Sequence, residues 1–486
     1  MTEKADLHYL TATEALGLFK SRELSPVELT DAVLARIEDT EPKVNAFSAL
    51  YPDEARRAAR EAEARYLGKG PAPRPLEGLT VAIKELTPLK GQQHTQASLA
   101  LKDVIATESA PAAERIQRAG AVIHGRTNSP EFGCATFTHS RLFGLTRNPW
   151  NLDFSPAGSS GGAAVALALG GTALAQGSDS AGSLRLPASA CGVVGFKPPY
   201  GRVPGLPPYG LETANSDGPM ARTVDDCALL ENVIAGPHLA DPNSVRPKLR
   251  IPESQKGIEG LRIANLTGIE GMDLDPDVEA NTRSAVDALE EAGAIVEDVD
   301  LGWSFETIIE AVGLHFSATY WPRVNRVLKD NRELLTSYIV AFADANAATE
   351  TPKDFELRAH EITTELWRPL AKVFRRNRAL LFPTLALPAP IAGEEYLERG
   401  PIINGREQAD QWIVGTTVPF NLMSRMPVIS VPTGFARTGV PTGLQIAGRP
   451  YDDREVFRIA RAFENKRPWL NDPQSRPALG VASPAS

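Results

Sequence analysis

One lysine in this sequence stands where its side chain could act as a base. Lys84 ends the apolar run Val81-Ala82-Ile83, so the stem of its side chain is expected to be buried. Burial disfavours the charged ammonium form, and a fall of roughly 3 units from a pKa of about 10.4 would bring the amine close to neutrality. A lysine at the end of a strand is more commonly an exposed charge, so Lys84 indicates catalysis only if a nucleophile lies beside it.

Two clusters of glycine and serine lie in the middle of the chain. Residues 158–162 are Gly-Ser-Ser-Gly-Gly and residues 178–183 are Ser-Asp-Ser-Ala-Gly-Ser, with a helix expected at 163–169 between them. Such runs form flexible linkers, phosphate-binding loops or loops that present a nucleophile. Apolar helix and strand patterns flank both clusters, unlike a linker, and no lysine follows the glycines as in a G-x-x-x-x-G-K-[ST] loop. The clusters therefore favour a nucleophilic serine.

Residues 158–162 also match the G-x-S-x-G elbow of α/β-hydrolases, which would pair a serine with a histidine. Pro156 interrupts the strand that should lead into such an elbow. His238, His315 and His360 follow in the sequence, but none lies in a glycine-flanked loop that could present a base. No H-E-x-x-H or similar spacing indicates a metal site. A serine–histidine esterase is therefore a third-ranked alternative, and no metal is expected.

The segments that would hold these residues alternate between helices and strands. A Ser-Pro-Val-Glu capping box at 25–28 begins one helix, and other helices are expected at 53–66 and 112–119. Short apolar strands are expected at 79–83, 121–123, 262–265, 380–382, 428–431 and 443–446. This alternation indicates an α/β fold. Residues 304–378 are mostly helical and rich in aromatic residues, which would pack on the main body or line a substrate channel.

The composition is that of an ordinary globular protein. The chain has 486 residues, of which 42% are hydrophobic and 23% charged, and 51 Lys plus Arg against 60 Asp plus Glu give a net charge of −9. This acidic balance argues against nucleic acid or an anionic membrane as the main partner. Three widely spaced cysteines fit a reducing compartment. Without a secretory signal or a sufficiently long apolar stretch, a cytoplasmic protein is expected.

Longer motifs around these residues resemble those of the amidase signature family, and the resemblance extends from about residue 7 to about residue 463. The motifs are Leu-Thr-Val-Ala-Ile-Lys-Glu at 79–85, Gly-Arg-Thr-Asn-Ser-Pro-Glu-Phe at 125–132, Asn-Pro-Trp-Asn-Leu at 148–152, Ser-Pro-Ala-Gly-Ser-Ser-Gly-Gly at 155–162, Ser-Ala-Gly-Ser-Leu-Arg-Leu-Pro at 180–187, Cys-Gly-Val-Val-Gly-Phe-Lys-Pro at 191–198, Pro-Phe-Asn-Leu at 419–422 and Gly-Leu-Gln-Ile-Ala-Gly-Arg-Pro at 443–450.

The resemblance implies one α/β/α domain over residues 1–486, with a mixed, twisted central sheet surrounded by helices. Within it we expect N-terminal helices at 1–70, a signature core with the catalytic residues at 71–250, and a helical substrate-side region at 304–378. The C-terminal part of the core would be 379–470, followed by a flexible tail at 473–486. The pocket walls are expected from the variable stretches 86–100, 134–143, the helical region after residue 304, and 393–418.

The resemblance also implies roles for the lysine and for the two clusters. Ser183 corresponds to the nucleophile that forms an acyl-enzyme, Ser159 to a bridging serine held by a cis peptide bond, and Lys84 to the catalytic lysine. The residues whose backbone N–H groups would form the oxyanion hole are Ser180, Ala181, Gly182 and Ser183, and the residues expected to support their loop are Asp179 and Arg185.

The implied function is hydrolysis of carboxylic amide bonds, extending in some members to esters or carbamates (urethanes), without a metal or organic cofactor. The expected partner is a small-molecule substrate, and a homodimer would be unsurprising. The main alternative is the glutamine-amidase subunit of a tRNA-dependent amidotransferase, which would depend on a partner subunit. The aromatic residues of 304–378 favour a more apolar substrate than glutamine.

Two residues depart from the usual family pattern. Ala181 stands where a glycine usually precedes Gly182, and Ala157 stands where a glycine usually precedes Gly158. If position 181 required a positive φ, the alanine would cost about 1 kcal/mol or more; otherwise its methyl group would reshape the pocket. Neither change touches a reacting atom, so we expect an effect on substrate preference rather than on the reaction.

Overall fold

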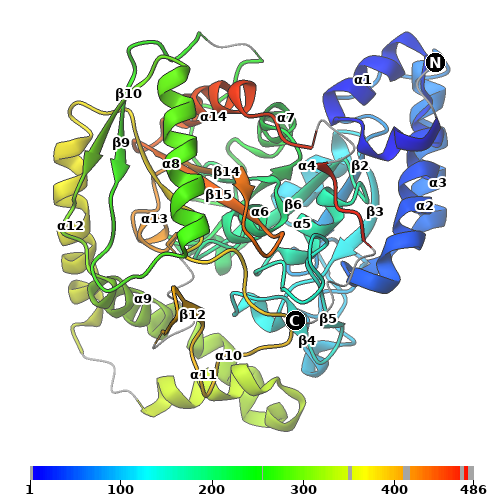
Figure 1. Ribbon diagram of the computed structural model, residues 1–486. Helices are drawn as coiled ribbons and strands as arrows, with labels where there is room; N and C mark the ends of the chain where they lie inside the picture. Colours follow the sequence, from blue (N-terminus) through cyan, green and yellow to red (C-terminus); the bar gives the residue numbers. More distant parts are fainter. Residues whose placement is uncertain (1–3, 254–255, 349–352, 409–415, 471–474, 480–486) are drawn as a thin grey trace.

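The computed structural model describes residues 4–253, 256–348, 353–408, 416–470 and 475–479. Within these residues one sheet of eleven strands runs across the molecule in the order β1-β3-β2-β6-β8-β7-β14-β15-β11-β9-β10 (Figure 1). Its strands are β1 (Phe47–Leu50), β2 (Thr80–Lys84), β3 (Val122–Thr127), β6 (Leu174–Asp179), β7 (Val194–Lys197), β8 (Ser216–Ala221), β9 (Arg262–Leu266), β10 (Ile295–Val299), β11 (Ala379–Pro383), β14 (Val428–Phe435) and β15 (Pro441–Gly448).

The sheet is mixed. Strand β2 is parallel to β3 and β6, and β9 is parallel to β10 and β11. The strands between these two parallel groups, β8, β7, β14 and β15, pair antiparallel. Two short hairpins lie outside the sheet, β4 (His139–Ser140) with β5 (Gly144–Leu145) and β12 (Ile402–Ile403) with β13 (Arg406–Glu407). The predicted α/β fold class and mixed central sheet are confirmed.

Helices cover both faces of the sheet, as the side chains of β11 show. Ala379 and Leu381 pack in one core cluster with residues of α8 and α14, whereas Leu380 and Phe382 pack in a second cluster with residues of α9 and α12. The α-helices of the described residues are α1 (Ala12–Ser21), α2 (Pro26–Val44), α3 (Pro52–Tyr66), α4 (Pro111–Arg118), α5 (Gly161–Ala168), α6 (Arg185–Cys191), α7 (Val224–Ile234), α8 (Pro276–Glu291), α9 (Phe305–Thr319), α10 (Trp321–Asn331), α11 (Ser337–Ala348), α12 (Phe355–Val373), α13 (Pro419–Leu422) and α14 (Asp453–Lys466).

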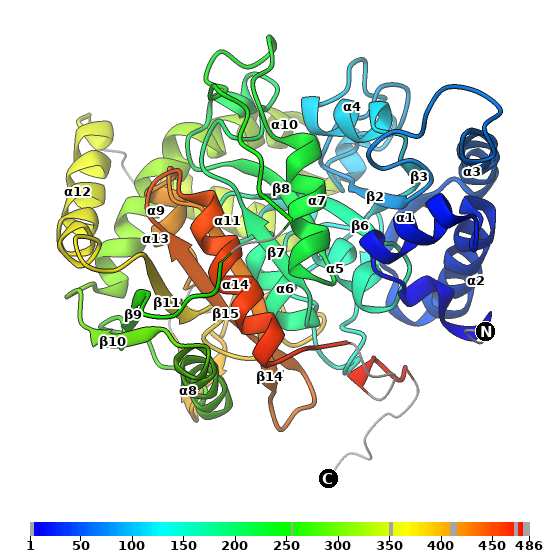
Figure 2. The same ribbon diagram turned by 90° about the horizontal axis from the view of Figure 1, so that it is seen from above.

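The N-terminal helices α1 to α3 lie at one end of the molecule and α12 at the other, in both views (Figures 1 and 2). The predicted capping box begins α2: the Val27 N–H donates to Ser25 Oγ at 3.0 Å, and the Ser25 N–H donates to Glu28 Oε2 at 2.9 Å. None of the described helices is long and apolar enough to cross a membrane. Of the tail expected to be flexible, residues 473–474 and 480–486 lie outside the described residues.

Candidate functional site

Lys84 lies at the carboxyl end of β2, between the parallel strands β3 and β6. Every residue of β2 is buried, and Lys84 itself is 0% exposed. Its Nζ lies within hydrogen-bond distance of Ser159 Oγ at 2.7 Å, Ser160 Oγ at 2.9 Å and Ser178 Oγ at 3.1 Å. The lysine predicted from the strand pattern is therefore in direct contact with both Gly/Ser clusters.

The surroundings of Lys84 favour its neutral form. Burial lowers the pKa of this amine from its ordinary value of 10.5 to about 7, while the carboxylates of Asp217, Asp179 and Glu85 act in the opposite direction. Desolvation is the larger effect because an ammonium without water around it loses most of its hydration energy. A neutral amine can accept a proton from a neighbouring hydroxyl near neutral pH.

Ser159 sits in a tightly packed turn before α5. The Gly158–Ser159 peptide bond is cis. A Cβ atom on Gly158 would lie 2.4 Å from the Phe137 carbonyl oxygen, so only glycine fits there. The preceding residue, Ala157, has a φ of 57° and is completely buried. The left-handed conformation, which costs an L-residue roughly 1–2 kcal/mol, is thus found at Ala157.

Ser183 lies on the loop between β6 and α6. It is half-buried and lines the same cavity as Ser159. Its carbonyl oxygen accepts a hydrogen bond from the Ser160 N–H at 3.1 Å. This bond ties the loop of residues 180–183 to the turn that carries Ser159.

The structure corrects one expected oxyanion-hole donor. The Gly182 N–H donates to Asp179 Oδ1 at 2.7 Å, so it is not free to bind a substrate oxygen. Gly182 is also the loop residue with a positive φ, 115°, whereas Ala181 is not in the left-handed region. Ala181 therefore costs no backbone strain. The remaining candidate donors are the N–H groups of Ser180, Ala181 and Ser183.

Thr417 holds the loop from the other side. Its Oγ1 donates to the Ala181 carbonyl oxygen at 2.7 Å. A Cβ atom on Gly182 would lie 2.0 Å from the same Thr417 oxygen, which no side chain could tolerate without a shift of the loop. Glycine at 182 is thus required both by its φ and by the close approach of Thr417.

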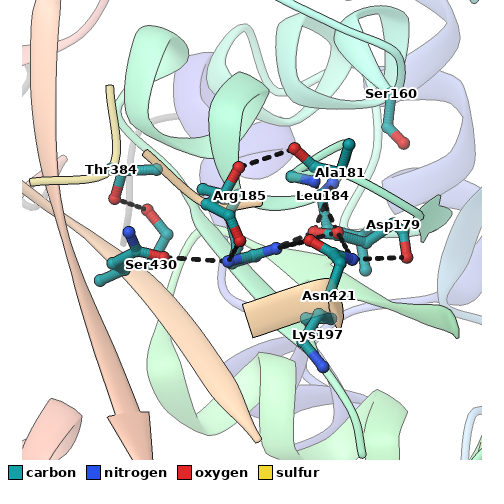
Figure 3. Close-up of polar contacts among 12 residues, drawn as sticks. Ser160, Asp179, Ala181, Leu184, Arg185, Lys197, Thr384, Asn421 and Ser430 are labelled. Carbon is teal, nitrogen blue, oxygen red and sulfur yellow. Dashed lines mark hydrogen bonds and ion pairs between the residues drawn. The ribbon is translucent and has the colours of Figure 1, made fainter. Parts of the chain in front are cut away.

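Asp179 and Arg185 form a completely buried ion pair beneath the loop (Figure 3). Arg185 Nε donates to Asp179 Oδ2 and Arg185 Nη2 to Asp179 Oδ1, both at 3.0 Å, and Asn421 Nδ2 donates to Asp179 Oδ1 at 2.8 Å. Burial alone would raise the pKa of Asp179, but the charge and hydrogen bonds of Arg185 outweigh it and hold this pKa well below its usual range. Asp179 therefore stays ionised and fixes the Gly182 and Leu184 N–H groups.

A cavity of about 490 Å³ opens above these residues. The expected stretches 86–100 and 134–143 contribute to its walls, and so do Phe316 of α9 and Tyr320 at its end. Other walls, at 104–110 and 200–217, were not expected. No described residue of 393–418 lines the cavity. Residues 402–407 of this stretch form the β12–β13 hairpin, and residues 409–415 lie outside the described residues.

Several residues of the site could not be assigned from the sequence. Ser178 lies in the second Gly/Ser cluster, but its contact with Lys84 depends on the pairing of β2 with β6. Asn421 lies in the motif at 419–422, and this motif was the available signal for it. No motif or pattern in the sequence pointed to Asp217. No cluster of His, Cys, Asp or Glu in the described parts of the chain has a geometry that could hold a metal ion.

Comparison with known proteins gives matches over nearly the full chain. The Amidase family model matches residues 28–457. An acylamidase of Rhodococcus erythropolis is 35% identical over 479 residues, covering 97% of this chain and 98% of that protein. A glutamyl-tRNA(Gln) amidotransferase subunit of Geotalea daltonii is 34% identical over 494 residues, covering 96% and 98%. The crystal structure of a bacterial aryl acylamidase of the amidase signature enzymes has a TM-score of 0.87 at 30% identity, covering 95% of this chain and 97% of that one.

Proposed function

Because the chain belongs to the amidase signature family and is an amide hydrolase, as the motifs predicted, we propose that it works through an acyl-enzyme on Ser183. The observation that carries this proposal is the buried amine of Lys84, which lies 2.7 Å from the hydroxyl of Ser159, a residue that lines the same cavity as Ser183. Lys84 would be the base, Ser159 the bridge for the proton and Ser183 the nucleophile.

In the proposed reaction, protons first move from Ser183 through Ser159 toward Lys84 and then move back along the same groups. Neutral Lys84 takes the proton of Ser159 while Ser159 takes that of Ser183, whose Oγ attacks the carbonyl carbon of the amide. The relay then returns the proton to the leaving nitrogen as the C–N bond breaks, which is necessary because an amide anion is a very poor leaving group. Water attacks the acyl group through the same relay and releases the acid.

The loop would stabilise the negative charge that develops on the carbonyl oxygen. The N–H groups of Ser180, Ala181 and Ser183 are the candidates, since Asp179 occupies that of Gly182. Each donor in such a hole is typically worth about 10²–10³ in rate. The Asp179–Arg185 pair and Thr417 would act by holding these donors in place rather than by touching the substrate.

We propose small-molecule amides with an apolar portion as substrates, and esters and carbamates as further ones. The apolar and aromatic side chains of the cavity, among them Leu206, Phe316 and Tyr320, support this choice, as does similarity to acylamidases. A cytoplasmic location, a homodimer and the division of one domain near residues 70, 250, 304 and 378 remain predictions from the sequence.

Similarity to glutamyl-tRNA(Gln) amidotransferases supports a second candidate, a glutamine amidase that works within a complex. The two functions differ in what the purified chain does alone. An independent hydrolase releases product without any other protein, whereas a component of an amidotransferase would need its partner subunits and would act on glutamine.

The test is a release assay with the purified chain on matched p-nitroanilides, p-nitrophenyl esters and aryl carbamates, with Ser183→Ala as control. We expect turnover of the anilides that is lost in Ser183→Ala and reduced to a small residue in Ser159→Ala. Turnover that survives Ser183→Ala would contradict the proposed nucleophile. Activity on glutamine that appears only with partner subunits would favour the second candidate.

A further inference from the structure

We infer that Asp217 binds a positively charged amine of the substrate, so that the preferred amides carry an ammonium group in addition to the bond that is cleaved. This inference deepens the proposed function and rests on it. It assigns a specificity role to a carboxylate in the wall of the cavity that contains Ser159 and Ser183.

The position of Asp217 follows from the pairing of two strands. In the antiparallel pair β6–β8, Asp217 lies directly opposite Ser178. Residues directly opposite each other in such a pair project their side chains from the same face of the sheet. Ser178 Oγ accepts a hydrogen bond from Lys84, and both Ser178 and Asp217 line the cavity. The carboxylate is therefore on the side of the sheet where the reaction is proposed to occur.

Asp217 differs from the other acidic residues of the cavity because no described residue donates a hydrogen bond to its carboxylate. Asp241 accepts hydrogen bonds from the Gly205 and Asn243 N–H groups, and Glu212 is paired with His315 at 2.8 Å. Glu108 is exposed to water. Burial raises the pKa of Asp217 to about 7, and Lys84 is the neighbouring charge that opposes this rise. Asp217 is half-buried in the cavity wall, and carboxylates largely removed from water are normally hydrogen-bonded, so a ligand that enters the cavity could supply the partner that the protein does not.

The chemistry of Lys84 favours a cation as that partner. An ionised Asp217 favours the protonated form of Lys84, which cannot accept a proton. An ammonium group of the substrate on Asp217 would offset this effect, whereas a neutral hydrogen-bond donor would offset less of it. The apolar walls at Val203, Leu206 and Phe316 suit a hydrocarbon segment between that amine and the scissile amide.

The test compares p-nitroanilides of aminoalkanoic acids with neutral partners in which a methyl group replaces the terminal ammonium, over a series of chain lengths. For the best length we expect a preference of about ten- to a hundredfold in kcat/KM for the charged compound, the range of a charge-assisted hydrogen bond. Asp217→Asn should abolish most of this ratio. Glu108→Gln, which removes a carboxylate from the exposed rim, should preserve it.

The same pairs of compounds are also measured for binding to Ser183→Ala and to Ser183→Ala combined with Asp217→Asn or Asp217→Ser. This measurement needs no turnover, so an effect of Asp217 on Lys84 as the base of the reaction does not enter it. Equal binding of charged and neutral compounds by Ser183→Ala at every length would overturn the inference, and so would a preference that persists without Asp217. Failure of the proposed function would be distinct: neither series would show turnover that depends on Ser183, whatever the binding preference.

Discussion

At the scale of single residues, the burial of Lys84 lowers the stability of the fold and gives the site an amine that can act as a base. Burial of its stem was expected from the apolar run before it, but the pattern alone would more commonly mean an exposed charge; the serine clusters and the family resemblance pointed to its contact with Ser159. Asp217 could not be predicted, because nothing local distinguishes it from a surface carboxylate. Its place beside the site depends on the register between β6 and β8.

The pH dependence of the reaction should report the titration of Lys84. The folded-state pKa is lowered to about 7, so kcat/KM should be high above this pH and fall below it as the amine gains a proton. Lys84→Ala should lose about 10²–10⁴-fold in kcat/KM. In Asp217→Asn the midpoint should move to lower pH, because Asp217 is one of the groups that raise the pKa of Lys84. A flat profile from about pH 5 to about pH 9, with chemistry rate-limiting, would contradict a lysine base.

The difference in unfolding free energy between Lys84→Met and the parent should depend on pH. The folded-state pKa is about 7 and the ordinary value 10.5, so between them the unfolded parent binds a proton that the native state lacks. The stability of the parent therefore rises with pH in this window, by at most about 1.4 kcal/mol per pH unit. The advantage of Lys84→Met should be largest below pH 7 and shrink toward pH 10.5. Urea unfolding across this range measures it, and the contribution of Lys197, which is also buried, is common to both proteins and cancels.

At the scale of elements, the backbone conformation and hydrogen bonds of the loop between β6 and α6 could not be predicted from sequence patterns. The capping box of α2 was predictable because it depends on neighbours in the sequence. The φ of Ala181 and the loss of the Gly182 N–H to Asp179 were not, since both depend on the buried Asp179–Arg185 pair and on Thr417, which lies far away in the sequence. The alanine that does adopt a positive φ is Ala157.

A pair of substitutions in this loop tests its rigidity. Gly182→Ala places a methyl group 2.0 Å from Thr417 Oγ1 at a φ of 115°, so we expect a loss of about 2 kcal/mol or more in stability and about a hundredfold in kcat/KM from the displaced loop. Ala181→Gly should cost at most about 1 kcal/mol and at most about tenfold in rate. Chemical denaturation and steady-state kinetics give both values. Equal effects of the two substitutions would show that the loop is not held as described.

At the scale of the whole molecule, the sheet collects motifs that are far apart in the chain. Strands, layers and the mixed sheet could be predicted from apolar runs and the family resemblance, but the walls of the cavity could not, because they come from the connections. The aromatic residues of the helical region 304–378 divide between the cavity and the core. Phe316 and Tyr320 line the cavity, whereas Trp321 and Tyr338 belong to a buried core cluster.

Substitutions in this helical layer should separate substrate binding from packing. Phe316→Ala should raise KM for apolar acyl anilides about tenfold, with a smaller effect on kcat, because the side chain lines the cavity but lies outside the proposed proton relay. Phe342→Ala removes a ring that contacts Trp321 and Tyr338 and does not line the cavity. It should lower thermal stability and leave KM unchanged. A rise in KM for Phe342→Ala and none for Phe316→Ala would place the binding wall elsewhere.

The identity of the acylated residue tests the proposed mechanism most directly. The enzyme is quenched during turnover of a p-nitrophenyl ester, or treated with a fluorophosphonate, and the modified peptide is identified by mass spectrometry. We predict one adduct per chain, on Ser183, with none on Ser159 or Ser160, and a much slower reaction in Lys84→Ala. An adduct on Ser159 or Ser160, or undiminished hydrolysis by an enzyme that carries no adduct, would contradict the assignment of Ser183 as the nucleophile.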